Sequence, residues 1–173
     1  METDSQRATP LTEIRDLHKT GTQKIIPFLW FNDNAEEAMN FYTSVFKDSK
    51  IVSISRSGNG GPVTTGVFEI AGQKFYVLNG GPHFKFTEAV SLFVNCETQE
   101  EVDELWDKLS EGGEKSRCGW LKDQFGLSWQ IIPTALGKLM YDKDREKSAR
   151  VMQAMLKMDK INIRLLEEAY NGE

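Results

Sequence analysis

The order of strand-like and helix-like segments, which occurs twice along the chain, constrains the fold more than any other feature. From Lys24 the pattern runs strand, helix and three short strands, and it starts again near Ala89. One such β-α-β-β-β unit predicts a curved sheet with a helix on one face. We therefore predict an α+β fold of two modules, residues 24–82 and 83–135, with an N-terminal arm over 1–23 and a C-terminal helical tail over 136–173.

In the first module, apolar runs separated by glycine turns predict strands. An apolar stripe at helical spacing follows Asn34, which together with Glu37 has the spacing of a variant capping box and so predicts the helix start. The stripe comprises Ala38, Phe41, Tyr42, Val45 and Phe46, and the predicted strands cover residues 25–31, 50–55, 63–70 and 74–79.

The second module has clearer signals. Thr98 and Glu101 form a capping box pattern, in which a hydroxyl and a carboxylate accept hydrogen bonds from free N–H groups at a helix start. An i, i+3, i+4, i+7 series follows and predicts an amphipathic helix that ends at Gly112-Gly113. The series is Val102, Leu105, Trp106 and Leu109, and the predicted strands cover residues 89–94, 114–117, 120–122 and 127–132.

Composition excludes several classes of protein. The chain has 173 residues, a net charge of −5 and a pI of about 5.2, without the concentrated basic face of a nucleic-acid binder. No apolar run approaches the roughly 20 residues of a membrane span, and no apolar leader follows the N-terminus. With only Cys96 and Cys118, we expect no disulfide framework, a buried free thiol at Cys96 and a cytoplasmic protein. The polar arm is expected to form at most one or two helical turns, over residues 12–19.

Short motifs occur in a fixed order from Lys24 to Gly172. They comprise residues 28–32, 40–42, 78–82, 91–96, 119–120, 125–126 and 128–130, with residues 150–158 in the tail. In this order they resemble the PhnB-like branch of the vicinal oxygen chelate superfamily, which includes glyoxalase I, extradiol dioxygenases and fosfomycin-resistance proteins. Genome annotation often gives that branch the label 3-demethylubiquinone 3-methyltransferase.

The resemblance implies a metal site with one side chain from each of four strand positions. Aligned on the closing strand, whose Asp-x-x-Gly turn begins at Asp123, these positions are Ile26, Tyr76, Ala89 and Gln130. A divalent ion of this type takes carboxylate or imidazole ligands, usually three from the protein. Only Gln130 could be a ligand, and an amide is a weak one. We therefore predict a degenerate metal site and no cofactor.

Since side chains alternate along strands, the residues that share a face with these four positions would line a cleft between the modules. The cleft is predicted to be aromatic, with a few polar groups that orient a ligand. Its predicted lining is Phe28, Trp30, Tyr76, Ser91, Phe93 and Gln130. This composition suits a small aromatic or hydrophobic metabolite held by apolar contact and two or three hydrogen bonds.

Two alternatives remain open at this point. In the first, the chain is an enzyme on a small organic substrate, either metal-free or with an unrecognised metal, in which Gln130 orients the substrate and either His83 or Tyr76 moves protons. In the second, the cleft is closed and the chain is a dimeric structural or interaction protein. The methyltransferase label itself lacks support, because the sequence has neither a Gly-x-Gly-x-Gly turn nor an alternating parallel strand order.

The tail is amphipathic. Its apolar positions recur at helical spacing, and such a face is buried against the same domain or against a partner. These positions are Met152, Met155, Leu156, Leu165, Leu166 and Ala169. Because the superfamily commonly forms dimers, the resemblance favours a homodimer.

Overall fold

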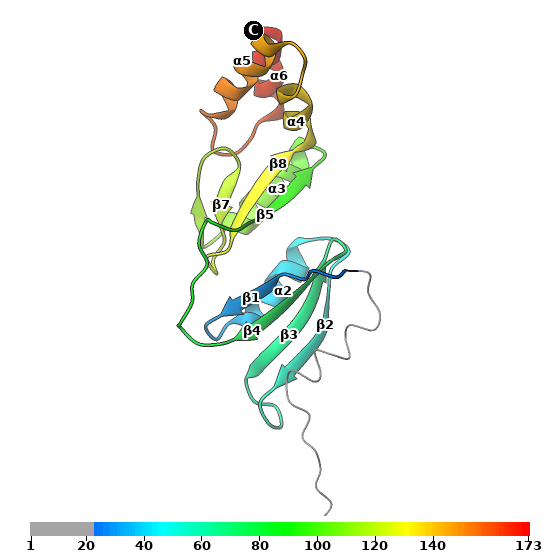
Figure 1. Cartoon of the computed structure of the whole chain (residues 1–173), viewed down its shortest axis with the longest axis vertical. Helices are drawn as coiled ribbons and strands as arrows, with labels where there is room; N and C mark the ends of the chain where they lie inside the picture. Colours follow the sequence, from blue (N-terminus) through cyan, green and yellow to red (C-terminus); the bar gives the residue numbers. More distant parts are fainter. Residues whose placement is uncertain (1–22) are drawn as a thin grey trace, which may run out of the picture. The chain divides into compact units, whose positions relative to one another are not determined.

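The computed structural model describes residues 23–173, and the chain divides into two compact units between Lys85 and Phe86. The predicted arm, with its helical turns over residues 12–19, lies outside the described residues apart from Gln23. Each unit contains one four-stranded sheet and one helix packed on it (Figure 1), which confirms the predicted α+β fold.

The first unit follows the predicted order of elements. Its sheet has the strand order β1-β4-β3-β2, in which β1 pairs with β4 in parallel and the other pairs are antiparallel. The elements are β1 (Phe28–Phe31), α2 (Ala35–Val45), β2 (Lys50–Arg56), β3 (Val63–Ile70) and β4 (Gln73–Asn79).

Helix α2 covers one face of this sheet. Its buried side chains include Met39, which the predicted stripe missed, whereas Phe41 and Phe46 of that stripe are only half-buried. A Cβ atom added at Gly66 on β3 would lie 2.7 Å from both Sδ and Cε of Met39, so a larger residue there would shift the end of the Met39 side chain. The ring of Tyr42 stacks on Phe68 with centroids 5.8 Å apart, which extends the buried layer across the sheet.

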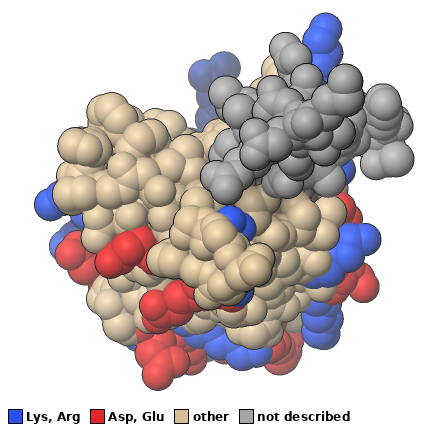
Figure 2. All heavy atoms as spheres, turned by 90° about the horizontal axis from the view of Figure 1, so that it is seen from below, with Lys and Arg blue, Asp and Glu red and all other residues tan. Residues whose placement is uncertain are grey.

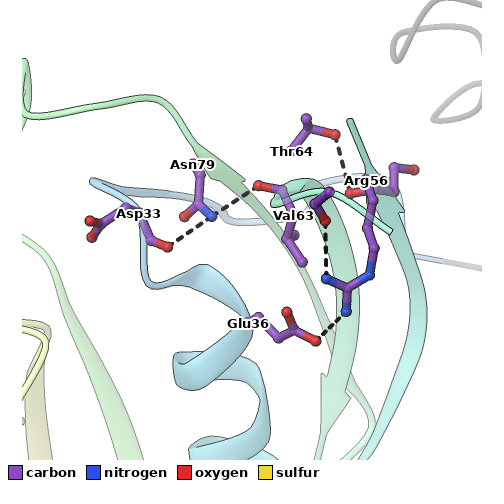
Figure 3. Close-up of polar contacts among 8 residues, drawn as sticks. Asp33, Glu36, Arg56, Val63, Thr64 and Asn79 are labelled. Atoms are coloured by element: carbon purple, nitrogen blue, oxygen red, sulfur yellow. Dashed lines mark hydrogen bonds and ion pairs between the residues drawn. The ribbon is translucent and has the colours of Figure 1, made fainter. Parts of the chain in front are cut away.

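A single side chain, Asn79 at the end of β4, joins three elements of the first unit (Figure 3). Its Oδ1 accepts a hydrogen bond from the backbone N–H of Ala35 at 2.9 Å. Its Nδ2 donates to the carbonyls of Asp33 and Val63 at 3.1 and 3.0 Å, the two bonds drawn in Figure 3. The predicted capping role of Asn34 is wrong, because the Asn34 side chain makes no capping hydrogen bond. A residue 44 positions away in sequence satisfies the helix start instead.

The second unit repeats the topology. Its sheet has the order β5-β8-β7-β6, and β5 pairs with β8 in parallel. Three further helices follow the last strand. The elements are β5 (Ser91–Cys96), α3 (Gln99–Ser110), β6 (Glu114–Lys115), β7 (Trp120–Lys122), β8 (Ser128–Pro133), α4 (Thr134–Met140), α5 (Arg145–Met155) and α6 (Ile163–Asn171).

The predicted start and apolar face of α3 are confirmed. The Thr98 hydroxyl accepts a hydrogen bond from the N–H of Glu101 at 3.2 Å, and the Glu101 carboxylate accepts one from the N–H of Glu97 at 2.7 Å. The carboxylate thus reaches one residue further back than in the standard capping box. All four predicted apolar positions, Val102, Leu105, Trp106 and Leu109, are buried.

The turn before β8 is built on the buried carboxylate of Asp123. Its Oδ1 accepts hydrogen bonds from the N–H groups of Phe125 and Leu127 at 2.9 and 3.0 Å, and its Oδ2 accepts one from the indole N–H of Trp129 at 2.8 Å. Gly126 adopts a positive φ of 83°, a conformation that favours glycine. The Asp-x-x-Gly pattern therefore has a structural role, which is to fix the start of β8.

The C-terminal tail packs on its own unit and forms a second small core beyond one end of β8 (Figure 1). This core consists of Ile132, Leu136, Val151, Ile161 and Leu166. Backbone hydrogen bonds from Cys118 to Met158 and from Gly119 to Asp159, of 2.8 and 2.7 Å, attach the segment before α6 to the loop before β7. The tail is therefore an integral part of the second unit.

Both opening strands begin later than predicted. Strand β1 begins at Phe28 rather than Ile25, and β5 begins at Ser91 rather than Ala89. Pro27 has no N–H to donate to a ladder. Before β5 the chain forms a turn in which the N–H groups of Ala89 and Val90 donate to Thr87, both at 3.4 Å, so these residues are not available to the sheet.

We expect Asn79→Ala to lower the free energy of unfolding by about 2 kcal/mol, because three hydrogen bonds are lost and the first turn of α2 loses its cap. Asn34→Ala is the matched control, since its side chain makes no capping bond, and it should change the free energy by less than about 0.5 kcal/mol. Urea titration of both variants measures the difference. Equal effects of the two substitutions would contradict the assignment of the cap to Asn79.

We expect Asp123→Asn to destabilise the second unit by about 1–3 kcal/mol, because an amide N–H₂ then faces the indole N–H of Trp129 or a backbone N–H. Trp129→Phe removes the indole donor, so Asp123→Asn should cost less in that background. A double-mutant cycle by urea unfolding measures this coupling. Strictly additive effects would show that the two side chains do not interact.

Candidate functional site

The face of the first sheet that α2 leaves uncovered is aromatic. Strand alternation places Phe28, Trp30 and Tyr76 on this face, because Leu29 and Phe31 are buried on the opposite side. Phe28 is 47% exposed and makes an edge-on contact with the Tyr76 ring, with centroids 5.9 Å apart. The structure thus brings together the three predicted site residues of this unit.

Trp30 is held in one orientation by the segment that follows β4. Its indole N–H donates to the carbonyl of Gly81 at 2.9 Å, and the exposed ring of Phe84 meets it edge-on with centroids 4.9 Å apart. A Cβ atom at Gly80 would lie 2.2 Å from the Trp30 ring, so this glycine permits the close approach. The segment over residues 80–84 therefore forms one wall of the aromatic face.

The uncovered face of the second sheet is more polar. The Gln130 amide Nε2 donates to the Ser91 hydroxyl at 2.8 Å, across the parallel pair β5 and β8. Phe93 and Trp120 are the register partners of Gln130 on either side, and Phe93 is 54% exposed. The predicted residues Ser91, Phe93 and Gln130 therefore form one group, to which the structure adds Trp120.

The observed register corrects two of the four family positions. Ile26 and Ala89 precede the strands, so they do not lie opposite Tyr76 and Gln130. The strand partner of Tyr76 is Phe28, and that of Gln130 is Phe93. Among residues 23–173, no three His, Cys, Asp or Glu side chains are grouped closely enough to hold a metal ion.

A charged group that the sequence did not predict lies at the edge of the uncovered face of the second sheet. Lys122, the register partner of Ser128, forms ion pairs with Glu88 at 2.5 Å and Glu114 at 3.7 Å. The Glu88 hydrogen bond raises the pKa of Lys122, and Lys122 in turn lowers the pKa of Glu88. A salt bridge between residues 34 positions apart has no signal in the sequence.

Two other candidate reactive groups differ in their access to solvent. His83 is exposed and follows β4 in the connecting segment. Cys96 is a buried free thiol, as predicted, and burial raises its pKa to about 12, with smaller contributions from Glu101 and Glu97. Cys96 therefore stays protonated near neutral pH and is unsuited to nucleophilic chemistry.

Charged side chains do not mark a site on the one face that Figure 2 draws. On the face drawn in Figure 2, acidic and basic side chains both occur around the visible rim, and the basic ones stand in several separate groups. An open depression of about 630 Å³ lies over the start of α2, lined by Asp33, Asn34, Glu36, Glu37 and Asn40. It lacks the apolar lining of a small-molecule pocket. No helix among residues 23–173 has the length and apolarity to span a bilayer.

Comparisons with known proteins bear directly on the family. A PhnB protein from Bacillus cereus is 42% identical, with a TM-score of 0.61 over 65% of this chain and 100% of that chain. Protein PA1353 from Pseudomonas aeruginosa is 17% identical, with a TM-score of 0.55 over 65% and 98% of the two chains. The fosfomycin resistance protein FosX from Listeria monocytogenes is 17% identical, with a TM-score of 0.52 over 68% and 95%. A comparison with curated proteins finds no match.

The two structures of 17% identity show a shared fold alone. The family comparison is more specific, because a model of the 3-demethylubiquinone-9 3-methyltransferase family matches residues 23–132. This match includes both sheets and stops before the C-terminal helices. The chain therefore belongs to the 3-demethylubiquinone-9 3-methyltransferase family, in its PhnB-type form with the glyoxalase-like fold of the vicinal oxygen chelate superfamily.

Proposed function

We propose that this protein binds a small aromatic or hydrophobic metabolite on the uncovered faces of its sheets, without a metal ion. The observation that carries the proposal is the aromatic face of the first unit, where Phe28 and Phe84 are 47% and 66% exposed. Exposed aromatic rings that are held in fixed contact with other rings are a common feature of sites for planar organic ligands.

The rigidity of this face supports binding rather than simple exposure. The hydrogen bond to Gly81 and the edge contact with Phe84 fix the Trp30 ring, and Tyr76 supports Phe28 from the neighbouring strand. A ligand that contacts these rings would lose little free energy to ordering them, because they are already ordered.

The residues at the family metal positions do not fit a divalent ion. Phe28 and Phe93 stand opposite Tyr76 and Gln130, and neither phenylalanine offers a donor atom. The Gln130 amide is already bonded to Ser91. A site of this type requires about three carboxylate, imidazole or thiolate ligands. We therefore propose no reaction step that depends on a metal ion.

Methyl transfer, which the family description names, has no counterpart among the described residues. Enzymes that use S-adenosylmethionine commonly bind it at a glycine-rich turn between a parallel strand and a helix of a doubly wound sheet. Here each sheet has one parallel pair, and Gly80-Gly81 follow β4 without a helix. An enzymatic role, in which Gln130 orients the substrate and His83 or Tyr76 moves protons, remains a second prediction.

Homodimer formation and a cytoplasmic location also remain predictions. The tail leaves Met152, Leu156 and Leu165 partly exposed, at 47%, 53% and 40%, after its own core is formed. These side chains are the part of the predicted stripe that is still available to a second copy.

Native mass spectrometry of protein purified without chelator or affinity metal tests the metal-free binding proposal. We expect no stoichiometric metal. We also expect an organic adduct, or binding of an added naphthalene-type ligand. Phe28→Ala should weaken this binding about tenfold or more, because a large contact area is lost. Tyr141→Ala is the matched control, since Tyr141 is 89% exposed and lies outside both sheets.

Two results would contradict the proposal. One metal ion per protomer, lost in Gln130→Ala, would restore the family metal site. Equal effects of Phe28→Ala and Tyr141→Ala on ligand binding would show that the aromatic face is not where the ligand lies.

A further inference from the structure

The hydroxyl group of Ser128 is the most unusual polar group in the second unit. Ser128 is fully buried, and its Oγ has no hydrogen-bond partner among residues 23–173. A buried hydroxyl without a partner costs free energy, so native proteins contain few of them. A ligand that bonds this hydroxyl would offset that cost.

Ser128 lies next to the polar pair already described. It is the register partner of Ser91 on β5, and it stands two residues before Gln130 on β8, so strand alternation places it on the same face. The buried indole of Trp129 points to the other side, where it bonds Asp123. Three polar side chains therefore gather on one small area of the face that α3 leaves free, where the Ser128 hydroxyl is itself buried.

The hydrogen bond between Gln130 and Ser91 determines what this area can still offer. Because the amide Nε2 donates to the Ser91 oxygen at 2.8 Å, the amide carbonyl Oε1 is left as an acceptor. The Ser91 hydroxyl hydrogen is left as a donor, and the Ser128 hydroxyl can donate as well. The area thus contains one acceptor beside two donors, of which the buried Ser128 hydroxyl becomes accessible only when its surroundings move.

The charge and shape of this area further limit the class of ligand that it can bind. The cation of Lys122, next to Ser128, is already paired with Glu88 and Glu114, so this lysine offers no uncompensated positive charge to an anion. Phe93 and Trp120 stand on the two sides of Gln130 and offer flat apolar surfaces. A flat, uncharged group with an N–H next to a C=O matches both the hydrogen bonds and the flanking rings.

We propose that Ser91, Ser128 and Gln130 form a recognition site for a planar lactam or carboxamide, whose N–H donates to Gln130 Oε1 and whose carbonyl accepts from the serine hydroxyls. This inference rests on the proposed function for the face of the second sheet, and it names the chemical class of the ligand bound there. Ser128 has a dual effect in this arrangement, because its hydroxyl destabilises the unliganded protein and strengthens the complex.

Titration with two probes of the same shape tests the inference. Quinolin-2-one carries the N–H beside its carbonyl, whereas coumarin has an oxygen atom in place of that N–H. Followed by ligand-observed NMR and calorimetry, quinolin-2-one should bind about tenfold more tightly than coumarin, because the ring oxygen would face the Gln130 carbonyl. Gln130→Met, which keeps the side-chain length, should abolish the preference without abolishing binding.

Ser128→Ala provides a second, independent test. It should weaken both probes about fivefold, since both use the carbonyl, and it should leave the thermal midpoint of the unliganded protein unchanged or raised. A purely structural serine would instead lower the midpoint and leave affinity unchanged, which would overturn the inference. Gln130→Met keeps the test decisive if Ser128→Ala fails to fold.

The remaining outcomes separate the two proposals. If both probes bind equally to the wild-type protein, the recognition site is refuted and the proposed function stands. Tighter binding of 2-naphthoate than of quinolin-2-one would also refute it, in favour of an anion site. If none of the three probes binds, both proposals are contradicted.

Discussion

Each four-stranded sheet of this protein has a single helix packed on one face, α2 on the first sheet and α3 on the second. The other features of the molecule follow from this arrangement. Side chains that point toward the helix build the core, including Phe68 under α2 and Trp129 under α3. Side chains at alternate positions point to the other face, where no helix of the same β-α-β-β-β module packs on them. These faces hold the aromatic rings of the first unit and the polar group of the second, and they are where binding chemistry can develop.

Hydrogen bonds from single buried or half-buried side chains fix the ends of the elements. Asn79 joins α2, β3 and β4, Asp123 fixes the turn before β8, and Gln99 at the start of α3 bonds the backbone of Ile161 and Ile163. Because the backbone groups at element ends have no partner within their own element, such side chains are stabilising wherever water is excluded. The same bonds hold β4 and β8 in place, so they also position Tyr76 and Gln130.

The family fold and the particular residues of this chain point to different chemistry. The fold of the vicinal oxygen chelate superfamily implies a metal ion, yet Phe28 and Phe93 occupy the places beside Tyr76 and Gln130. What remains is an amide that is bonded to a serine, next to a buried hydroxyl and flat apolar rings. We propose that these groups bind an uncharged organic molecule rather than a divalent metal ion.

The sequence by itself determined the repeated module, the apolar face of α3 and the grouping of Ser91, Phe93 and Gln130, because these depend on local periodicity and on strand alternation. Only the tertiary structure decided the start of β1 and β5, the cap on α2 by Asn79, and the pairing of Lys122 with Glu88. It also decided that Val151 and Leu166 pack against Ile132 of the last strand. These features join residues far apart in the chain, and a local pattern carries no information about which distant group will satisfy a backbone N–H, a charge or an apolar face.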